Sequence, residues 1–208
     1  MNKSSVSSQA ALASTGFAPA LVPSRTATLF RASVVVFLGS VLVAICSHIA
    51  IPLWFTPVPL TLQPFAVLVL GLLLSPRMAA VTLFTYLAEG AAGLPVFAPG
   101  LAFSAGFAHL FGPTGGYLLV YPAAAFLIAA LWRRVQRTYW FALISAAAGN
   151  LLILAGGALW LSAFAHASLQ TATTLAVMPF LPGDALKVAA AAAIGAGWAR
   201  FRHNREEA

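Results

Sequence analysis

Residues 138–161 read TYWFALISAAAGNLLILAGGALWL and contain no Asp, Glu, Lys or Arg. About 20 helical residues cross a hydrocarbon core of about 30 Å, so this stretch is long enough to span a bilayer. Five further apolar segments flank it in the chain, at 32–51, 62–76, 78–94, 115–132 and 182–199. None alternates apolar and polar residues as membrane β-strands do. The pattern predicts an all-α integral membrane protein with six transmembrane helices, of which the second and third are short.

The composition argues against a soluble protein. Of the 208 residues, 61% are hydrophobic and 7% are charged, whereas a soluble domain carries about 25% charged residues. The net charge of +7 does not indicate nucleic acid as a partner, because the few positive charges lie between apolar blocks. The single cysteine, Cys46, lies in an apolar run and is expected to be a small buried residue. We therefore expect membrane lipid around the chain and no nucleic acid.

Basic residues predict how the helices are oriented. Cytoplasmic flanks of membrane helices are rich in Lys and Arg. Three connections, at 52–61, 95–114 and 162–181, contain neither residue. Ten of the eleven Lys and Arg residues lie at the opposite ends of the segments: Lys3, Arg25, Arg31, Arg77, Arg133, Arg134, Arg137, Arg200, Arg202 and Arg205. Both termini are therefore expected in the cytoplasm, which requires an even number of crossings.

The chain is expected to contain one membrane domain and two tails. Residues 1–23 are rich in Ser, Ala and Thr and lack the continuous apolar core of a secretory signal. We expect residues 1–28 to form a disordered cytoplasmic tail, and 202–208 to form a second tail. The six-helix domain that binds a substrate would then occupy 29–201.

The first two outer connections are unusual for loops. Residues 51–64 read IPLWFTPVPLTLQP, and residues 94–117 read LPVFAPGLAFSAGFAHLFGPTGGY. They are too apolar to be solvated tethers and too rich in Pro and Gly to be helices. Irregular backbone at membrane depth is tolerated where protein buries it or where it lines a cavity. We expect these loops to cap a pocket that faces outside; the alternative is ordinary interfacial loops with aromatic anchors.

The acid–base pair Asp184 and Lys187 stands at the outer start of the last segment, in FLPGDALKVAAAA. A spacing of three residues places both side chains on one helix face. Asp184 suits the first turn of a helix, where the dipole favours an acid, and Lys187 could extend its ammonium to the interface. The pair is therefore either a structural cap or a ligand-binding pair turned inward.

Other polar residues near the outer ends are candidates for the same cavity. Glu89 could accept a hydrogen bond from a ligand, pair two helices or carry a proton, and Asn150 could bind ligand or bond between helices. The side chains of Gln63, Tyr86 and Tyr117 could line the cavity wall.

No catalytic or metal site is expected. Three histidines near the outer side lack metal-ligand spacing and are interpreted as interfacial or packing residues: His48, His109 and His166. The run GPTGGY at 112–117 lacks the Gly-Lys-Ser/Thr ending of a phosphate loop. No serine or histidine forms a nucleophile motif, so the sequence does not indicate an enzyme.

A stripe of small residues recurs every four positions in the last segment, at Ala185, Ala189, Ala193 and Gly197. Such stripes let helices approach closely. The stripe would pack either within the chain or against another subunit, so self-association is one interpretation.

Four stretches in order closely resemble the BioY family, the substrate-binding (S) components of biotin transporters of the energy-coupling-factor type. They are WFTPVPLTLQPFAVLVLGLLLSPRMA at 54–79, YLAEGAAGLPVFA at 86–98, GPTGGYLL at 112–119 and PFLPGDALKVAAAA at 179–192. With the helix count, the resemblance covers about residues 30–200.

The resemblance implies biotin uptake by an S-component bundle of six helices in the bacterial cytoplasmic membrane. Biotin is the transported ligand, and no cofactor is implied. A transmembrane coupling protein and ATP-binding subunits are the implied partners. Asp184 and Lys187 match the family's Asp-x-x-Lys position, which contacts biotin. The sulfur-containing ring and the alkyl chain of biotin would be enclosed by apolar and aromatic residues, among them Trp54, Phe55, Phe97 and Tyr117.

Two points stay open at this stage. Some relatives use an arginine near the pocket, but no outer segment here has one, so carboxylate recognition is expected to differ. The alternative to a subunit energised by ATPases is a stand-alone or ion-coupled biotin carrier that uses Glu89 as its titrating group.

Overall fold

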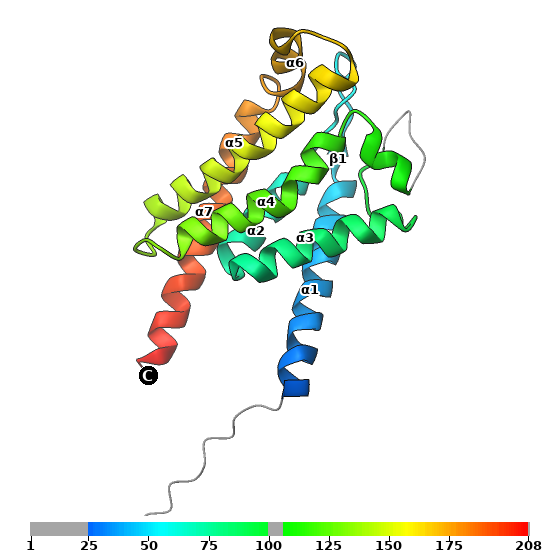
Figure 1. The fold of residues 1–208 in the computed structure, drawn as a ribbon. Helices are drawn as coiled ribbons and strands as arrows, with labels where there is room; N and C mark the ends of the chain where they lie inside the picture. Colours follow the sequence, from blue (N-terminus) through cyan, green and yellow to red (C-terminus); the bar gives the residue numbers. More distant parts are fainter. Residues whose placement is uncertain (1–24, 100–105, 208) are drawn as a thin grey trace, which may run out of the picture. The chain divides into compact units, whose positions relative to one another are not determined.

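The computed structural model describes residues 25–99 and 106–207. Within them the chain forms seven α-helices, one 3-10 helix and one two-stranded hairpin (Figure 1). The elements in chain order are α1 (Arg25–His48), β1 (Ala50–Ile51), β2 (Leu60–Thr61), α2 (Gln63–Leu73), α3 (Pro76–Ala91), η1 (Phe107–Phe111), α4 (Gly115–Trp132), α5 (Tyr139–Phe164), α6 (Leu169–Ala176) and α7 (Leu181–Glu206). The all-α prediction is confirmed. Residues 1–31 and 32–208 form separate units, and the contacts given below lie within the second.

Each of the six apolar segments contains a helix, and α6 is an additional one. Its sequence, LQTATTLA, is too polar and short to show apolar periodicity. Ser168 caps its start, because the Ser168 hydroxyl accepts a hydrogen bond from the Thr171 amide. Helix α7 continues through part of the stretch expected to be a tail, 202–208, and ends at Glu206. Of the other expected tail, 1–28, residues 1–24 lie outside the described part of the chain.

Helix lengths support several membrane crossings. Three helices, α1, α4 and α5, are each long and apolar enough to span a bilayer, and α6 with α7 forms a fourth candidate that bends by 58°. Helix α2 has 11 residues and α3 has 16, which correspond to about 16 and 24 Å. Both therefore fall short of the hydrocarbon core when taken alone.

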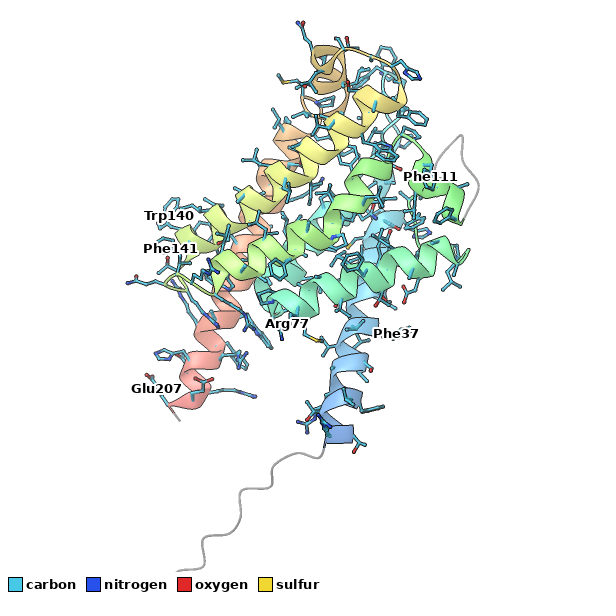
Figure 2. All side chains as sticks on the ribbon, viewed as in Figure 1. Phe37, Arg77, Phe111, Trp140, Phe141 and Glu207 are labelled. Carbon is cyan, nitrogen blue, oxygen red and sulfur yellow. The ribbon has the colours of Figure 1, made fainter. Side chains whose placement is uncertain are left out.

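Aromatic side chains lie at both ends of the hairpin formed by α4 and α5. Figure 2 shows Phe111 just before α4 and Trp140 and Phe141 at the start of α5, at the other end of α4. All three are exposed. Trp and Tyr are enriched at the interfaces of a bilayer, so the placement of Trp140 at a helix end fits a helix that crosses one.

Small residues bring α4 and α5 together. The two helices run alongside each other in Figure 1, and glycines on both supply the room. A Cβ on Gly157 would lie 2.1 Å from Cζ of Tyr117, and one on Gly116 would lie 2.1 Å from Cβ of Trp160. Glycine at these positions therefore permits the close packing that membrane helices rely on.

Most of the small-residue stripe on α7 is exposed within the described chain. Ala185, Ala193 and Gly197 are exposed and Ala189 is half-buried. A Cβ on Gly197 would meet no atom within 4 Å. The opposite face of α7, which includes Val188 and Ala192, faces the helix core instead.

The connection between α1 and α2 is a hairpin fastened to α6. Strands β1 and β2 pair antiparallel, with Ala50 opposite Thr61. The Thr56 hydroxyl, in the loop between them, donates to the carbonyl of Leu175 at 3.0 Å. Trp54 and Phe55 stand at the tip, where Trp54 is 96% exposed. The irregular backbone is thus supported by protein contacts.

Candidate ligand-binding site

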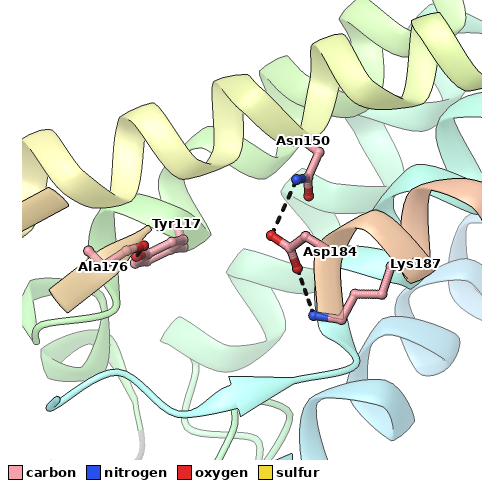
Figure 3. Close-up of polar contacts among 5 residues, drawn as sticks. All are labelled: Tyr117, Asn150, Ala176, Asp184 and Lys187. Carbon is pink, nitrogen blue, oxygen red and sulfur yellow. Dashed lines mark hydrogen bonds and ion pairs between the residues drawn. The ribbon is translucent and has the colours of Figure 1, made fainter. Parts of the chain in front are cut away.

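Asp184 lies at the centre of a buried polar cluster near the start of α7. Its Oδ1 accepts from Nζ of Lys187 at 2.9 Å, and its Oδ2 accepts from Nδ2 of Asn150 on α5 at 3.2 Å (Figure 3). The side chains of Asp184 and Lys187 are only 5% and 11% exposed. Asp184 also occupies the first turn of α7, where the helix dipole favours a negative charge. The pair is therefore buried and charge-matched.

Asn150 has an unused acceptor. Its Oδ1 is buried and has no hydrogen-bond partner among the described residues. A buried polar atom without a partner costs about 1–3 kcal/mol, so such atoms are expected to find partners in a functional state. A ligand or a water in contact with this cluster would supply one.

Asp184 and Lys187 face a cavity of about 530 Å³, counted with its open mouth. Six more polar side chains lie at its wall: Thr61, Gln63, His109, Thr114, Tyr117 and Tyr121. The apolar wall includes Val58, Pro59, Leu118, Ile153, Leu154 and Phe180. The cavity combines a large apolar surface with a few polar groups, which is typical of a site for a small organic molecule.

Tyr117 and Thr56 hold the bend between α6 and α7 at the cavity. The Tyr117 hydroxyl donates to the carbonyl of Ala176, the last residue of α6, and Figure 3 shows the two side by side. Thr56 bonds the preceding carbonyl, that of Leu175. The bend that brings Asp184 to the wall is therefore fixed from α4 and from the β1–β2 hairpin.

A second series of hydrogen-bonded side chains lies behind the cavity wall. Nε2 of Gln63 donates to the Tyr86 hydroxyl at 2.6 Å, and that hydroxyl donates to the carbonyl of Val96 at 2.9 Å. The Ser47 hydroxyl of α1 is also 2.7 Å from the Val96 carbonyl. This series joins α1, α2 and α3 to the segment that follows α3.

Four of the ten predicted site residues line the cavity: Gln63, Tyr117, Asp184 and Lys187. The other six lie elsewhere. Asn150 is in contact with Asp184, and Tyr86 is fully buried behind Gln63. Phe97 is buried between the Tyr86 and His109 rings.

The remaining three predicted residues also lie off the described cavity wall. Glu89 Oε1 accepts from the Ser40 hydroxyl of α1 at 3.0 Å, so it joins α1 to α3. Trp54 and Phe55 are exposed at the hairpin tip, where their rings meet edge to face.

Sequence reasoning did not assign four polar wall residues to the cavity: Thr61, His109, Thr114 and Tyr121. His109 was expected to be an interfacial or packing residue; it does pack on Phe97, and it also faces the cavity. Burial lowers the pKa of the His109 imidazole. An isolated histidine in a long connection carries no periodicity, so only Tyr121, four residues after Tyr117 on one helix face, had a signal in the sequence.

Comparison with known proteins decides the family. The BioY family profile matches residues 14–204. The chain belongs to the BioY family. Among its BioY relatives is a protein of Pyrococcus horikoshii named probable biotin transporter BioY. It is 41% identical over 138 residues, which are 66% of this chain and 78% of that protein.

Two further comparisons agree. The biotin transporter BioY of Thermotoga maritima is 37% identical over 153 residues, which are 74% of this chain and 86% of that protein. A crystal structure of the S-component for biotin from an ECF-type ABC transporter has a similar fold, with a TM-score of 0.77 and 25% identity. The likeness covers 86% of this chain and 95% of that one. Membership of BioY and the apolar helices identify this chain as a multi-pass membrane protein of a transporter family.

Proposed function

We propose that this chain takes up biotin as the substrate-binding subunit of an energy-coupling-factor transporter. The observation that carries the proposal is the buried Asp184–Lys187 pair at the wall of a cavity of about 530 Å³, in a chain whose relatives are named biotin transporters. The chain supplies affinity and specificity, and no bond is made or broken in it.

The chemistry of the cavity suits biotin. The ureido ring has two N–H donors, for which the Asp184 carboxylate is an acceptor, and the free Oδ1 of Asn150 is a second acceptor beside it. Lys187 offers donors to the ureido carbonyl or to the carboxylate. The apolar wall, which includes Leu118, Ile153 and Phe180, would enclose the sulfur ring and the alkyl chain.

The proposed topology has six membrane-crossing helices with both termini in the cytoplasm of a bacterial cell. Helices α1 to α5 and α7 are the six, with α2 and α3 extended by the loops that flank them. The distribution of Lys and Arg supports this orientation, because ten of the eleven lie on one side. The cavity and the β1–β2 hairpin would then face the outside.

Partner proteins would supply the energy. We propose a transmembrane coupling protein and ATP-binding subunits, since a structural relative is the S-component of an ECF-type ABC transporter and this sequence has no phosphate-loop motif. Biotin would enter when the hairpin loop releases Thr56 from Leu175. ATP hydrolysis by the partners would drive reorientation and release inside.

The direct test is binding of labelled biotin to the purified chain. Unlabelled biotin should compete, whereas pantothenate, thiamine and riboflavin at the same concentration should not. Failure to bind biotin, or equal competition by another vitamin, would contradict the proposed substrate.

The test of energisation is uptake in cells that lack all coupling ATPases. Uptake should be lost there while binding by the same membranes persists. Full uptake without ATPases would instead favour a stand-alone carrier.

A further inference from the structure

The cavity offers a second cationic candidate besides Lys187. Biotin has two polar ends, the ureido ring and a carboxylate, separated by an alkyl chain. The Lys187 ammonium is already paired with Asp184 at 2.9 Å. Of the described residues at the wall, only Lys187 and His109 have side chains that can carry a positive charge. If a side chain other than Lys187 binds the biotin carboxylate, His109 is therefore the candidate.

The orientation of His109 is held by a stack of rings. Its imidazole stacks on Phe97, with centroids 5.0 Å apart and planes 25° apart. Phe97 meets Tyr86 edge to face at 5.5 Å and fills the space beside Gly90, where a Cβ would lie 2.1 Å from Cζ of Phe97. His109 is only 8% exposed, and the ring stack holds its imidazole at the cavity wall.

The ring nitrogens of His109 are available. No side-chain hydrogen bond joins them to another residue in 25–99 or 106–207, and the contacts of His109 there are its ring stack and backbone bonds. By contrast, Tyr117 donates to Ala176 and Gln63 donates to Tyr86. Burial lowers the pKa of the imidazole, the ring has an N–H donor in either protonation state, and an approaching carboxylate would favour the protonated form.

We infer that His109 donates a ring N–H to the carboxylate of biotin and so sets the preference for the acid over its neutral analogues. This inference rests on the proposed function and adds to it the residue that reads the acidic end. The Asp184–Lys187 pair is thereby assigned to the ureido ring.

The experiment compares biotin with biotinol, in which an alcohol replaces the carboxylate, on the full-length purified chain. In His109→Phe the ring can still stack on Phe97 but has no nitrogen. Biotin affinity should fall about ten- to a hundredfold, while biotinol affinity stays the same. His109→Asn, which keeps an amide donor, should restore part of the difference. His166→Asn, at an exposed histidine of the same outer side, should change neither affinity.

The outcomes separate the two proposals. Wild-type protein that binds neither ligand contradicts the proposed function itself. Wild-type protein that binds biotin, together with His109→Phe that binds it equally well, overturns only the role of His109. An equal loss of affinity for biotin and biotinol in His109→Phe also overturns the role of His109. Such a loss would indicate a structural defect, which affects both ligands alike. The biotinol affinity thus serves as the check that the variant is folded.

Discussion

At the scale of single residues, the Asp184–Lys187 pair is the feature on which ligand binding depends most. Asp184→Asn and Lys187→Met each leave a buried polar partner uncompensated, so each should weaken biotin binding by about 2–5 kcal/mol. The double variant should lose less than the sum, because the two residues act as a unit. Calorimetric titration of biotin measures all three.

The matched control for this pair is a solvent-exposed ion pair on the same helix. Arg202 and Glu206 lie 4.0 Å apart near the end of the same helix, with side chains 58% and 72% exposed. Glu206→Gln should leave biotin affinity unchanged, because exposed pairs contribute little. Unaltered binding in both Asp184→Asn and Lys187→Met would remove the pair from the site.

Glu89 is the residue that separates the two transport hypotheses. Its Oε1 contacts the Ser40 hydroxyl and it does not line the described cavity. Gln keeps that oxygen, so Glu89→Gln should hold biotin affinity and ATPase-dependent uptake within about twofold. Uptake by cells measures the result. Abolished transport with intact binding would instead assign Glu89 the proton-carrying role of an ion-coupled carrier.

At the scale of elements, glycines determine how closely α4 and α5 approach. A Cβ at position 157 would overlap the Tyr117 ring, and Tyr117 holds the end of α6. Gly157→Ala should therefore destabilise the fold by about 1–3 kcal/mol and weaken biotin binding. Gly197→Ala, where a Cβ meets no atom within 4 Å, should be neutral or slightly stabilising. Thermal unfolding in detergent compares them, and equal stability of the two variants would contradict this account of the packing.

At the scale of the whole molecule, the asymmetry of basic residues predicts which surface each end of the bundle meets. Cysteines introduced by Trp54→Cys and Glu206→Cys would occupy highly exposed positions, and the native Cys46 is buried. A membrane-impermeant thiol reagent added outside intact cells should label position 54 and not position 206. The reverse result would invert the topology and place the cavity mouth in the cytoplasm.

The helices and the acid–base pair were predictable from the chain alone. Lipid excludes unpaired backbone polar groups, so long apolar segments must become helices. A spacing of three residues brings Asp184 and Lys187 together within one helix, and the structure has them in contact. Residues from both Pro-rich loop stretches were expected at the cavity, and Val58, Pro59 and Ala98 do line it.

Only the tertiary structure determined which residues line the cavity. Periodicity defines the faces of one helix, but the neighbour that each face meets depends on contacts between distant parts of the chain. Asn150 and Asp184 are 34 residues apart, and Thr56 and Leu175 are 119 apart. Tertiary contacts also position Tyr86 behind the wall and His109 on it, since both rings pack on Phe97.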